Sequence, residues 1–259
     1  MSDSSQTLWQ AALDRIFSAP ERAALRLWRR EREVAALHRA GLAKLKREPQ
    51  LLQPARLNLG SGRFRKEGFV NIDLGPSADV TLDLRQGLPF DSSSSGFIFS
   101  EHCFEHFDYP TGIEVLLRDC LRVLRPGAEM QFSVPDTQWP LEAYASNEGL
   151  SGAYYRVCRE RNWHPASCTT RLEHINYHFR QRGEHRYAYD EETAVKLLTG
   201  VGFVAVGRRP YDPVLDSAHR ELGSLFMIAT KPALTPTSHG HALESKAAAM
   251  PVATSSRPQ

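Results

Sequence analysis

Two short apolar runs that end in small or acidic residues lie near the start of the central region. The first reads Leu-Asn-Leu-Gly-Ser-Gly at residues 57–62, and the second ends in Asn71-Ile72-Asp73. Glycine has no Cβ, so a glycine turn adopts positive φ and lets the backbone approach a ligand closely. A carboxylate at the tip of the next strand can accept hydrogen bonds from both hydroxyls of a ribose. The pattern predicts an open α/β sheet that binds an adenosine-containing cofactor at the carboxyl ends of its strands.

The spacing argues against a dinucleotide. That fingerprint requires a third glycine, G-x-G-x-x-G, and an acid about 20 residues further on. Arg65 stands at the third glycine position, and Asp73 follows Gly62 too soon for a full helix between them. An NAD-dependent oxidoreductase is therefore disfavoured.

Five segments, taken in chain order, resemble the class I S-adenosylmethionine-dependent methyltransferases, and most closely their compact, type 11-like branch. The resemblance runs from Arg56 to Pro232. The segments are LNLGSG with the later GFVNID, ADVTLDL at 78–84, LPF at 88–90 with GFIFS at 96–100, EHCFEH at 101–106, and LRVLRPG at 121–127.

The resemblance implies S-adenosylmethionine as the cofactor. The expected binding residues are Asn58, Gly60, Ser61, Gly62, Asp73, Asp83, Leu84, Ser100 and Glu101. In the family pattern Asp73 holds the ribose hydroxyls, and Asp83 with Leu84 contacts the adenine. The chain departs from that pattern at Asn58, where an acid is common, and at Ala128, where a second glycine is usual.

Candidate catalytic residues follow the strand expected at 96–100. A sulfonium methyl group is already activated, so a base is needed only for a hydroxyl or a protonated amine. Histidine titrates near neutral pH without perturbation. We therefore expect His106 and His102 to be the candidate bases, with Glu105 as an orienting partner, and we assign no residue as a metal ligand.

The same segment allows a second chemistry, because His102-x-x-Glu105-His106 also matches the inverted zinc-peptidase motif. A zinc hydrolase would need both histidines on one helix face and a third ligand, such as Glu173 or His174. Against this alternative, Asp108-Tyr109-Pro110 would end any such helix within a turn.

A long insertion over residues 137–186 is predicted to form a lid and the acceptor site. It is dense in aromatic and histidine residues: Trp139, Tyr144, Tyr154, Tyr155, Trp163, His164, His174, Tyr177, His178, Phe179 and His185. Rings with hydrogen-bonding edges suit sugars, phenols and other small amphipathic molecules. Arginines of the insertion favour an anionic acceptor, namely Arg156, Arg159, Arg161, Arg180, Arg182 and Arg186. We expect methyl transfer to oxygen on a small molecule or a glycan.

Residues 1–55 are predicted to be a helical extension that Pro20 opens and Pro49 closes. Residues 1–56 carry 11 Lys/Arg and 6 Asp/Glu of the 32 and 30 in the chain. The helix could pack on the domain or a partner subunit, or lie on an anionic membrane surface through Trp28. A non-catalytic scaffold that acts through this helix is an alternative function. A nucleic-acid partner is not expected, and the oligomeric state stays open.

Alternation of short apolar strands with helical stretches predicts a Rossmann-like, doubly wound, mostly parallel seven-stranded sheet with an antiparallel last strand. The strands are expected near 56–60, 69–73, 79–83, 96–100, 128–134, 203–209 and 224–231, with helices on both faces. The methyltransferase domain should span 56–232, and the Ala-, Ser- and Pro-rich residues 233–259 should be a disordered tail.

The four cysteines show no C-x-x-C spacing, and no N-terminal stretch resembles a signal peptide. No apolar run approaches the roughly 20 residues of a membrane span. From these features we expect a cytoplasmic protein with reduced thiols.

Overall fold

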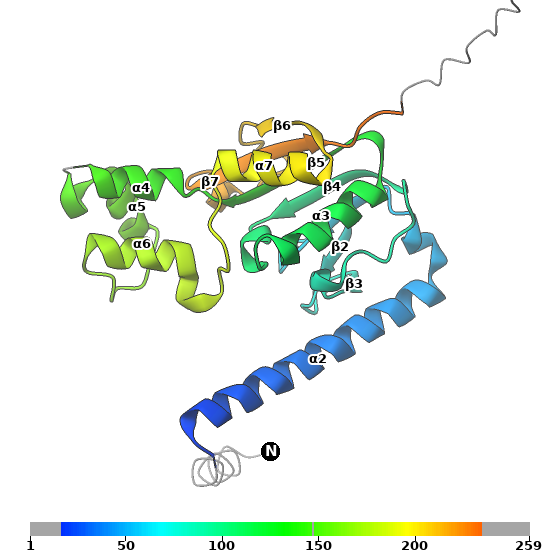
Figure 1. The fold of residues 1–259 in the computed structure, drawn as a ribbon, viewed down its shortest axis with the longest axis horizontal. Coiled ribbons are helices and arrows are strands. Elements are labelled where there is room, and N and C mark those ends of the chain that lie inside the picture. Colours follow the sequence, from blue (N-terminus) through cyan, green and yellow to red (C-terminus); the bar gives the residue numbers. More distant parts are fainter. Residues whose placement is uncertain (1–16, 147, 235–259) are drawn as a thin grey trace, which may run out of the picture.

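The structure is a computed structural model that describes residues 17–146 and 148–234. The start of the N-terminal extension and nearly all of the tail expected over 233–259 lie outside the described residues. Figure 1 shows a central sheet, a long N-terminal helix on one side, and three short helices grouped beyond one end of the sheet.

Seven strands form a single sheet in the order β3-β2-β1-β4-β5-β7-β6. Their bounds are β1 Arg56–Leu59, β2 Val70–Asp73, β3 Val80–Thr81, β4 Ser95–Glu101, β5 Leu124–Pro135, β6 Val204–Arg208 and β7 Ser224–Thr230. Strand β7 is antiparallel to both of its neighbours, and the other neighbouring pairs are parallel. The sequence-based prediction of this sheet is therefore confirmed.

One face of the sheet carries the main hydrophobic core, packed against α3 (Thr111–Val123) and α7 (Glu191–Val201). Helix α3 presents Ile113, Leu116, Leu117 and Cys120, each at most 1% exposed, at the spacing of one helix face. Helix α7 begins where Asp190 accepts a hydrogen bond from the Thr193 amide at 2.8 Å. In Figure 1 both helices lie in front of the strands.

Loops contact the side chains of Phe99 on β4 and Phe226 on β7. The Lys66 ammonium lies 4.5 Å from the ring centroid of Phe99, and the Arg209 guanidinium lies 5.2 Å from that of Phe226. Residues 60–69 and 74–79, which join β1 to β2 and β2 to β3, are too short to form a helix and return to the sheet. These two connections are therefore loops, and the α-helices around the sheet come from other parts of the chain.

Helix α2 (Ala19–Arg47) covers the exposed edge of β3. Its contacts come from its C-terminal half: Thr81 Oγ1 donates to the Leu37 carbonyl at 2.9 Å, and Lys44 Nζ donates to the Asp79 carbonyl at 2.8 Å. The close approach requires glycine at position 41, where an ideal Cβ would lie 1.9 Å from the Thr81 carbonyl oxygen. None of the described helices combines the length and apolar character needed to cross a bilayer.

The three helices at the end of the sheet, α4 (Gln138–Ala145), α5 (Ala153–Glu160) and α6 (Arg171–Arg180), belong to the insertion predicted to be a lid. They share a small separate core of Tyr154, Tyr155, Cys158 and Ile175. Both ends of the insertion meet at one place. Asp136 forms an isolated β-bridge with Tyr189, and Thr137 Oγ1 donates to the Tyr189 carbonyl at 2.7 Å.

Candidate active site

The sheet reverses its winding between β1 and β4, which lie side by side while the chain continues outward from each in opposite directions. Open α/β sheets bind ligands at the carboxyl ends of the strands at such a reversal. The Ser100 hydroxyl, near the end of β4, donates to the Leu59 carbonyl at the end of β1 at 3.1 Å. This bond fixes the two strand ends relative to each other.

The glycine turn after β1 has one closed side and one open side. Gly60 and Gly62 adopt φ of +68° and +51°. An ideal Cβ at Gly60 would lie 2.4 Å from Cys103 Sγ, whereas at Gly62 it would meet no atom within 4 Å. Between them Ser61 is 5% exposed, and its hydroxyl has no hydrogen-bond partner among the described residues. The turn thus offers open backbone together with a buried, unsatisfied hydroxyl.

Asp73, at the end of β2, faces this turn. Its Oδ2 accepts a hydrogen bond from the Gly62 amide at 2.9 Å, and its Oδ1 accepts one from the Gly75 amide at 2.7 Å. A carboxylate offers about four acceptor positions. Asp73 is therefore held in place and keeps accepting capacity for a ligand.

Asn58 supports the turn from behind. It is 2% exposed, and its Nδ2 donates to Asn71 Oδ1 at 2.9 Å. The same Asn71 oxygen accepts from the Lys66 amide at 2.8 Å. The side chain expected to contact the cofactor instead joins β1 to the loop that leads into β2.

Asp83 lies in different surroundings from those the family pattern implies. Its carboxylate accepts from the Arg85 amide, Nε and Nη2 and from Gln86 Nε2, at 2.9–3.3 Å. Burial opposes ionisation, but these hydrogen bonds outweigh it and lower the pKa of the Asp83 carboxyl. Its four acceptor positions are filled, so adenine would find no free oxygen there. Leu84 is 7% exposed and belongs to the core.

Glu101, at the end of β4, anchors a segment from the far end of the chain. The Ser217 amide donates to Glu101 Oε1 at 2.9 Å, and the Ser217 hydroxyl donates to Oε2 at 2.5 Å. This contact positions residues 218–224 over the strand ends. Two of them, His219 and Arg220, then line the cavity described next.

A cavity of about 760 Å³ opens between the strand ends and the lid. The three expected catalytic residues, His102, Glu105 and His106, all line it. The lid contributes aromatic and basic side chains, and the loops at the sheet contribute two further arginines: Trp163, His164, Tyr177, His178, Arg182, His185, Arg63 and Arg220. Gly60, Gly62, Asp73 and Asp83 are not among the lining residues of this cavity.

His102 has both ring nitrogens engaged. Arg220 Nη1 lies 3.0 Å from its Nδ1, and Ser224 Oγ lies 2.8 Å from its Nε2. A guanidinium can only donate, so Nδ1 must accept and Nε2 must carry the proton. Burial, followed by the charge of Arg220, holds the pKa of His102 well below its usual value. The ring is therefore a fixed neutral imidazole.

His106 is oriented differently. Its Nδ1 lies 2.9 Å from the Glu184 carbonyl, which can only accept, so Nδ1 carries the proton. The lone pair on Nε2 is left for another donor, and this nitrogen lies 3.9 Å from Glu105 Oε1. The side chain of His106 is 40% exposed at the cavity, whereas that of Glu105 is 2% exposed.

Glu105 is an unsatisfied buried carboxyl. Its Oε2 has no hydrogen-bond partner among the described residues, and its Oε1 lies 3.5 Å from His102 Nδ1. Burial raises the pKa of Glu105 to about 8. The group is thus mainly a neutral acid at pH 7, able to donate a hydrogen bond toward the cavity.

The helix that the zinc-hydrolase alternative requires is not formed. His102 has φ of +48° in the strand exit, and residues Phe104–His106 form only a short 3-10 turn. A different set, Glu105, His106 and His185, places one ligand atom from each residue within 4.8 Å of the others. His185 Nδ1 lies 3.0 Å from the His178 carbonyl, so its Nε2 is also left as an acceptor. These three residues could hold a divalent metal ion beside the acceptor cavity.

Comparison with known proteins assigns one segment of the chain to a family. Residues 53–132, which include the turn, Asp73, Asp83 and the segment 101–106, match the family model described as a methyltransferase domain. The chain carries a class I S-adenosylmethionine-dependent methyltransferase domain. No sequence among the curated proteins matches the chain significantly.

Several solved methyltransferase structures are similar to this domain in outline. Phosphoethanolamine N-methyltransferase 2 of Haemonchus contortus, solved with S-adenosyl-L-methionine, is 13% identical, with a TM-score of 0.42; the match covers 75% of this chain and 52% of that one. An S-adenosylmethionine-dependent methyltransferase of Methanosarcina mazei is 16% identical over 69% of this chain and 92% of its own, with a TM-score of 0.42. The chain therefore spans about half the length of the Haemonchus enzyme that it matches.

The turn fits S-adenosylmethionine on its own geometry. The open backbone at Gly62 allows a ligand to lie against the turn, and the unsatisfied Ser61 hydroxyl offers a polar contact there. Asp73 keeps acceptor positions for two ribose hydroxyls. Adenine contacts in this methyltransferase domain would have to come from groups other than the Asp83 carboxylate.

Sequence reasoning missed the segment that completes the cavity. Ser217, Arg220 and Ser224 contact Glu101 and His102 from more than 100 positions away in the chain. They lie outside every motif of the methyltransferase domain. The local sequence gives no signal for these long-range contacts. His185, which also lines the cavity, was by contrast named among the aromatic and histidine residues of the lid.

Proposed function

We propose that this domain transfers a methyl group from S-adenosylmethionine to an oxygen, in preference to a nitrogen, on an anionic small molecule or glycan. The carrying observation is the His106 ring, whose Nδ1 donates to the Glu184 carbonyl and whose Nε2 is thereby left as a proton acceptor at the cavity. A hydroxyl acceptor needs such a base near neutral pH.

The cofactor's binding residues in this proposal are Gly60, Ser61, Gly62 and Asp73. When bound, S-adenosylmethionine supplies the activated methyl group. Asp73 would accept hydrogen bonds from the ribose hydroxyls, and the Ser61 hydroxyl would bond a polar atom of the cofactor. Ser100 and Cys103 hold the carboxyl ends of β1 and β4 together below the turn.

The two histidines take different roles. His106 accepts the proton of the acceptor hydroxyl at Nε2, because its lone pair is free. His102 cannot accept a further proton without losing the Arg220 hydrogen bond at Nδ1, so it acts as a positioning residue for Arg220. Glu105, neutral when its pKa is about 8, orients the rings on either side of it.

The preference for an anionic acceptor follows from the cavity wall. Three guanidinium groups, on Arg63, Arg182 and Arg220, line it, against the carboxyl groups of Glu105 and Glu184. Since Glu105 is mainly neutral near pH 7, the wall carries a positive balance. Trp163 and Tyr177 add flat apolar surface against which a sugar or an aromatic ring can stack.

A matched acceptor panel tests the proposal. The purified chain would be incubated with S-adenosylmethionine and pairs of acceptors that differ in one group: a hydroxyl against the corresponding amine, and a carboxylate or phosphate against a neutral form. Formation of S-adenosylhomocysteine is the readout. We expect turnover to favour the anionic hydroxyl compounds. Turnover restricted to amines, or equal turnover of neutral and anionic forms, would contradict the acceptor class while leaving the domain assignment intact.

Addition of a chelator separates base catalysis from metal assistance at Glu105, His106 and His185. If His106 acts as a base without a metal ion, dialysis against a chelator leaves methyl transfer unchanged. Loss of turnover, with recovery on adding Mg²⁺ or Mn²⁺, would instead assign these three residues to a divalent metal ion.

A further inference from the structure

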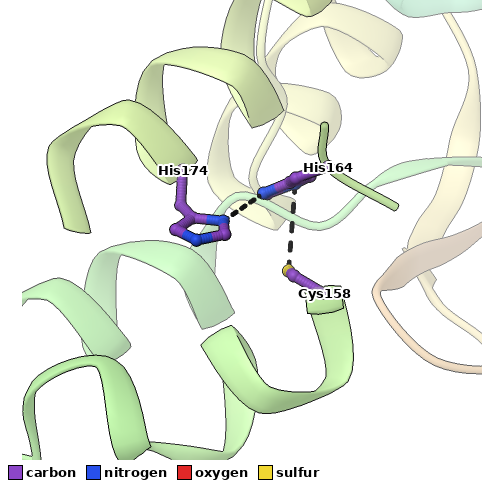
Figure 2. Close-up of side chains that lie close together, drawn as sticks. All are labelled: Cys158, His164 and His174. Carbon is purple, nitrogen blue, oxygen red and sulfur yellow. Dashed lines mark hydrogen bonds between the residues drawn. The ribbon is translucent and has the colours of Figure 1, made fainter. Parts of the chain in front are cut away.

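Three metal-ligating side chains converge inside the lid, apart from the strand ends. Cys158 lies on α5, His164 in the loop between α5 and α6, and His174 on α6. His164 Nδ1 is 2.8 Å from His174 Nδ1, and His164 Nε2 is 3.8 Å from Cys158 Sγ. In Figure 2 the His164 ring lies between the other two side chains and faces both.

We propose that the lid binds a structural zinc ion through Cys158, His164 and His174, with Cys168 as the fourth ligand. One ligand atom from each of the first three residues lies within 4.8 Å of the others. Tetrahedral Zn²⁺, with bonds of about 2.1 Å to nitrogen and about 2.3 Å to sulfur, holds its ligand atoms roughly 3.3–3.8 Å apart. If both histidines bind through Nδ1, these two nitrogens, 2.8 Å apart, would separate by roughly 0.5 Å, and the widest pair would close by at most about 1 Å.

The chemistry of the donor set selects zinc among the common divalent ions. Thiolate and imidazole ligands suit Zn²⁺, whereas Mg²⁺ and Ca²⁺ prefer carboxylate and carbonyl oxygens. In chain order the four ligands give the pattern Cys158-x5-His164-x3-Cys168-x5-His174. A mixed set of two cysteines and two histidines is one of the usual closed, four-coordinate zinc sites.

Protonation of the cluster also agrees with metal binding. Burial, followed by the nearby His178 and His174, lowers the pKa of His164 to about 3, and burial lowers that of His174. Both rings are therefore neutral, the form that binds a metal ion. Burial raises the pKa of the Cys158 thiol to about 11, but a bound zinc ion displaces that proton, because a coordinating thiol is deprotonated.

Cys168 lies outside the group of atoms within 4.8 Å of one another and would have to move to complete the set. It is in the same loop as His164, and its Sγ lies 3.7 Å from the carbonyl of Glu173, the residue before His174. After burial, which is the main cause, the Cys168 thiol contributes to the raised pKa of Cys158. In this proposal, a rearrangement of the loop that carries both His164 and Cys168 brings Cys168 to the ion, while Cys158 and His174 stay on α5 and α6.

A zinc ion would stabilise the lid, because the hydrophobic core of the lid is small. Among the lid residues that the structure describes, the fully buried apolar cluster consists of Tyr154, Tyr155, Cys158 and Ile175, and domains with so small a core often need a metal ion to hold their elements together. The same loop carries Trp163 and His164, which line the acceptor cavity. Zinc in the lid would thus fix one wall of that cavity.

Metal analysis of the purified full-length chain is the primary test. We expect about one zinc per chain in the wild type, and less than about a tenth of that in Cys158→Ala and His174→Ala, as for a structural site that depends on every ligand. Cys120→Ala is the matched control, because Cys120 is a buried free thiol on α3. His106→Ala is the second control, and it removes the set of Glu105, His106 and His185.

Both controls should keep their zinc. Zinc kept in Cys158→Ala, or lost in His106→Ala with the lid variants unaffected, would overturn the proposal. Binding of S-adenosylmethionine shows whether each variant is folded, because the glycine turn lies on the sheet and outside the lid.

Cobalt substitution tests the site in the wild-type chain, and comparison with Cys168→Ala tests the number of thiolates. Tetrahedral Co²⁺ bound by two cysteines gives a thiolate-to-metal charge-transfer band, and Cys168→Ala should halve its intensity. An unchanged band in Cys168→Ala would overturn the assignment of the fourth ligand. The absence of any such band in the wild type would overturn the site.

Discussion

Arg220 donates a hydrogen bond to Nδ1 of His102 across 3.0 Å, although 118 positions separate the two residues. This bond fixes the tautomer of His102 and removes its lone pair from use as a base. It also places a guanidinium group in the wall of the acceptor cavity. The different roles of His102 and His106 therefore depend on a contact made by Arg220, which is far from both in the sequence.

The first prediction concerns the two aspartates. Asp73→Asn should weaken S-adenosylmethionine binding by roughly 1–3 kcal/mol, the scale of a lost hydrogen bond to a charged group. Asp83→Asn should leave that affinity nearly unchanged and lower the free energy of unfolding instead, because the Asp83 acceptor positions are filled by Arg85 and Gln86. Calorimetric titration and urea denaturation of both variants separate the effects. A reversed pattern would place Asp83, not Asp73, at the cofactor.

The second prediction concerns His106. His106→Ala should lower kcat roughly 10²–10⁴-fold, the usual contribution of a general base, with cofactor affinity kept. Added imidazole should restore part of the rate, since the missing group is a neutral base. A variant that retains the wild-type rate, or one that imidazole does not rescue, would assign His106 a structural role.

The third prediction is a pH dependence of stability that originates at Glu105. Its folded pKa of about 8 lies above the ordinary value of 4.5, so the folded state holds a proton that the unfolded state releases. Stability from this group is present below pH 4.5 and is lost as the pH rises toward 8. The buried histidines, with lowered pKa values, oppose this only below about pH 6.5.

Glu105→Gln removes the Glu105 contribution and serves as the comparison. Between pH 6.5 and 8, the wild type should lose stability relative to Glu105→Gln by up to about 1.4 kcal/mol per pH unit. Urea denaturation of both proteins at several pH values measures the difference. A difference that stays constant with pH would show that Glu105 is ionised in the folded state.

The fourth prediction uses two helical glycines with opposite surroundings. Gly41→Ala should destabilise the protein, because its Cβ would lie 1.9 Å from the Thr81 backbone oxygen and force α2 away from β3. Gly200→Ala on α7 meets no neighbour within 4 Å and should stabilise the helix by about 0.5–1 kcal/mol. Thermal unfolding of the two variants provides the measurement. Equal effects would mean that α2 does not dock on the sheet edge.

Local sequence predicted the sheet well, because each strand is an apolar run bounded by turn residues. The turn at Gly60 and Gly62 could also be predicted from the sequence, since the positive φ there favours glycine. Contacts between segments that are far apart in the chain could not be predicted from the local sequence. The partners of His102, which are Arg220 and Ser224, depend on how the loop after β6 returns over the strand ends.

Two other features escaped prediction for physical reasons. Asp83 was expected at the adenine, but the Arg85 side chain reaches back over two positions and takes its oxygens. The lid cluster was missed because the spacings between Cys158, His164 and His174 match neither a helix period nor a tight ligand pair. Only the turn of chain between α5 and α6 brings them together.

The lid leaves the sheet after Asp136 and returns at Tyr189, and the two points are joined by a β-bridge and by the Thr137 hydroxyl. Because the two ends of the insertion are joined in this way, we expect that residues 138–188 can be replaced by another insertion without changing the order of the strands. Grafting another insertion between Asp136 and Tyr189 would therefore change which acceptors the protein binds, while the cofactor-binding residues on the sheet stay the same.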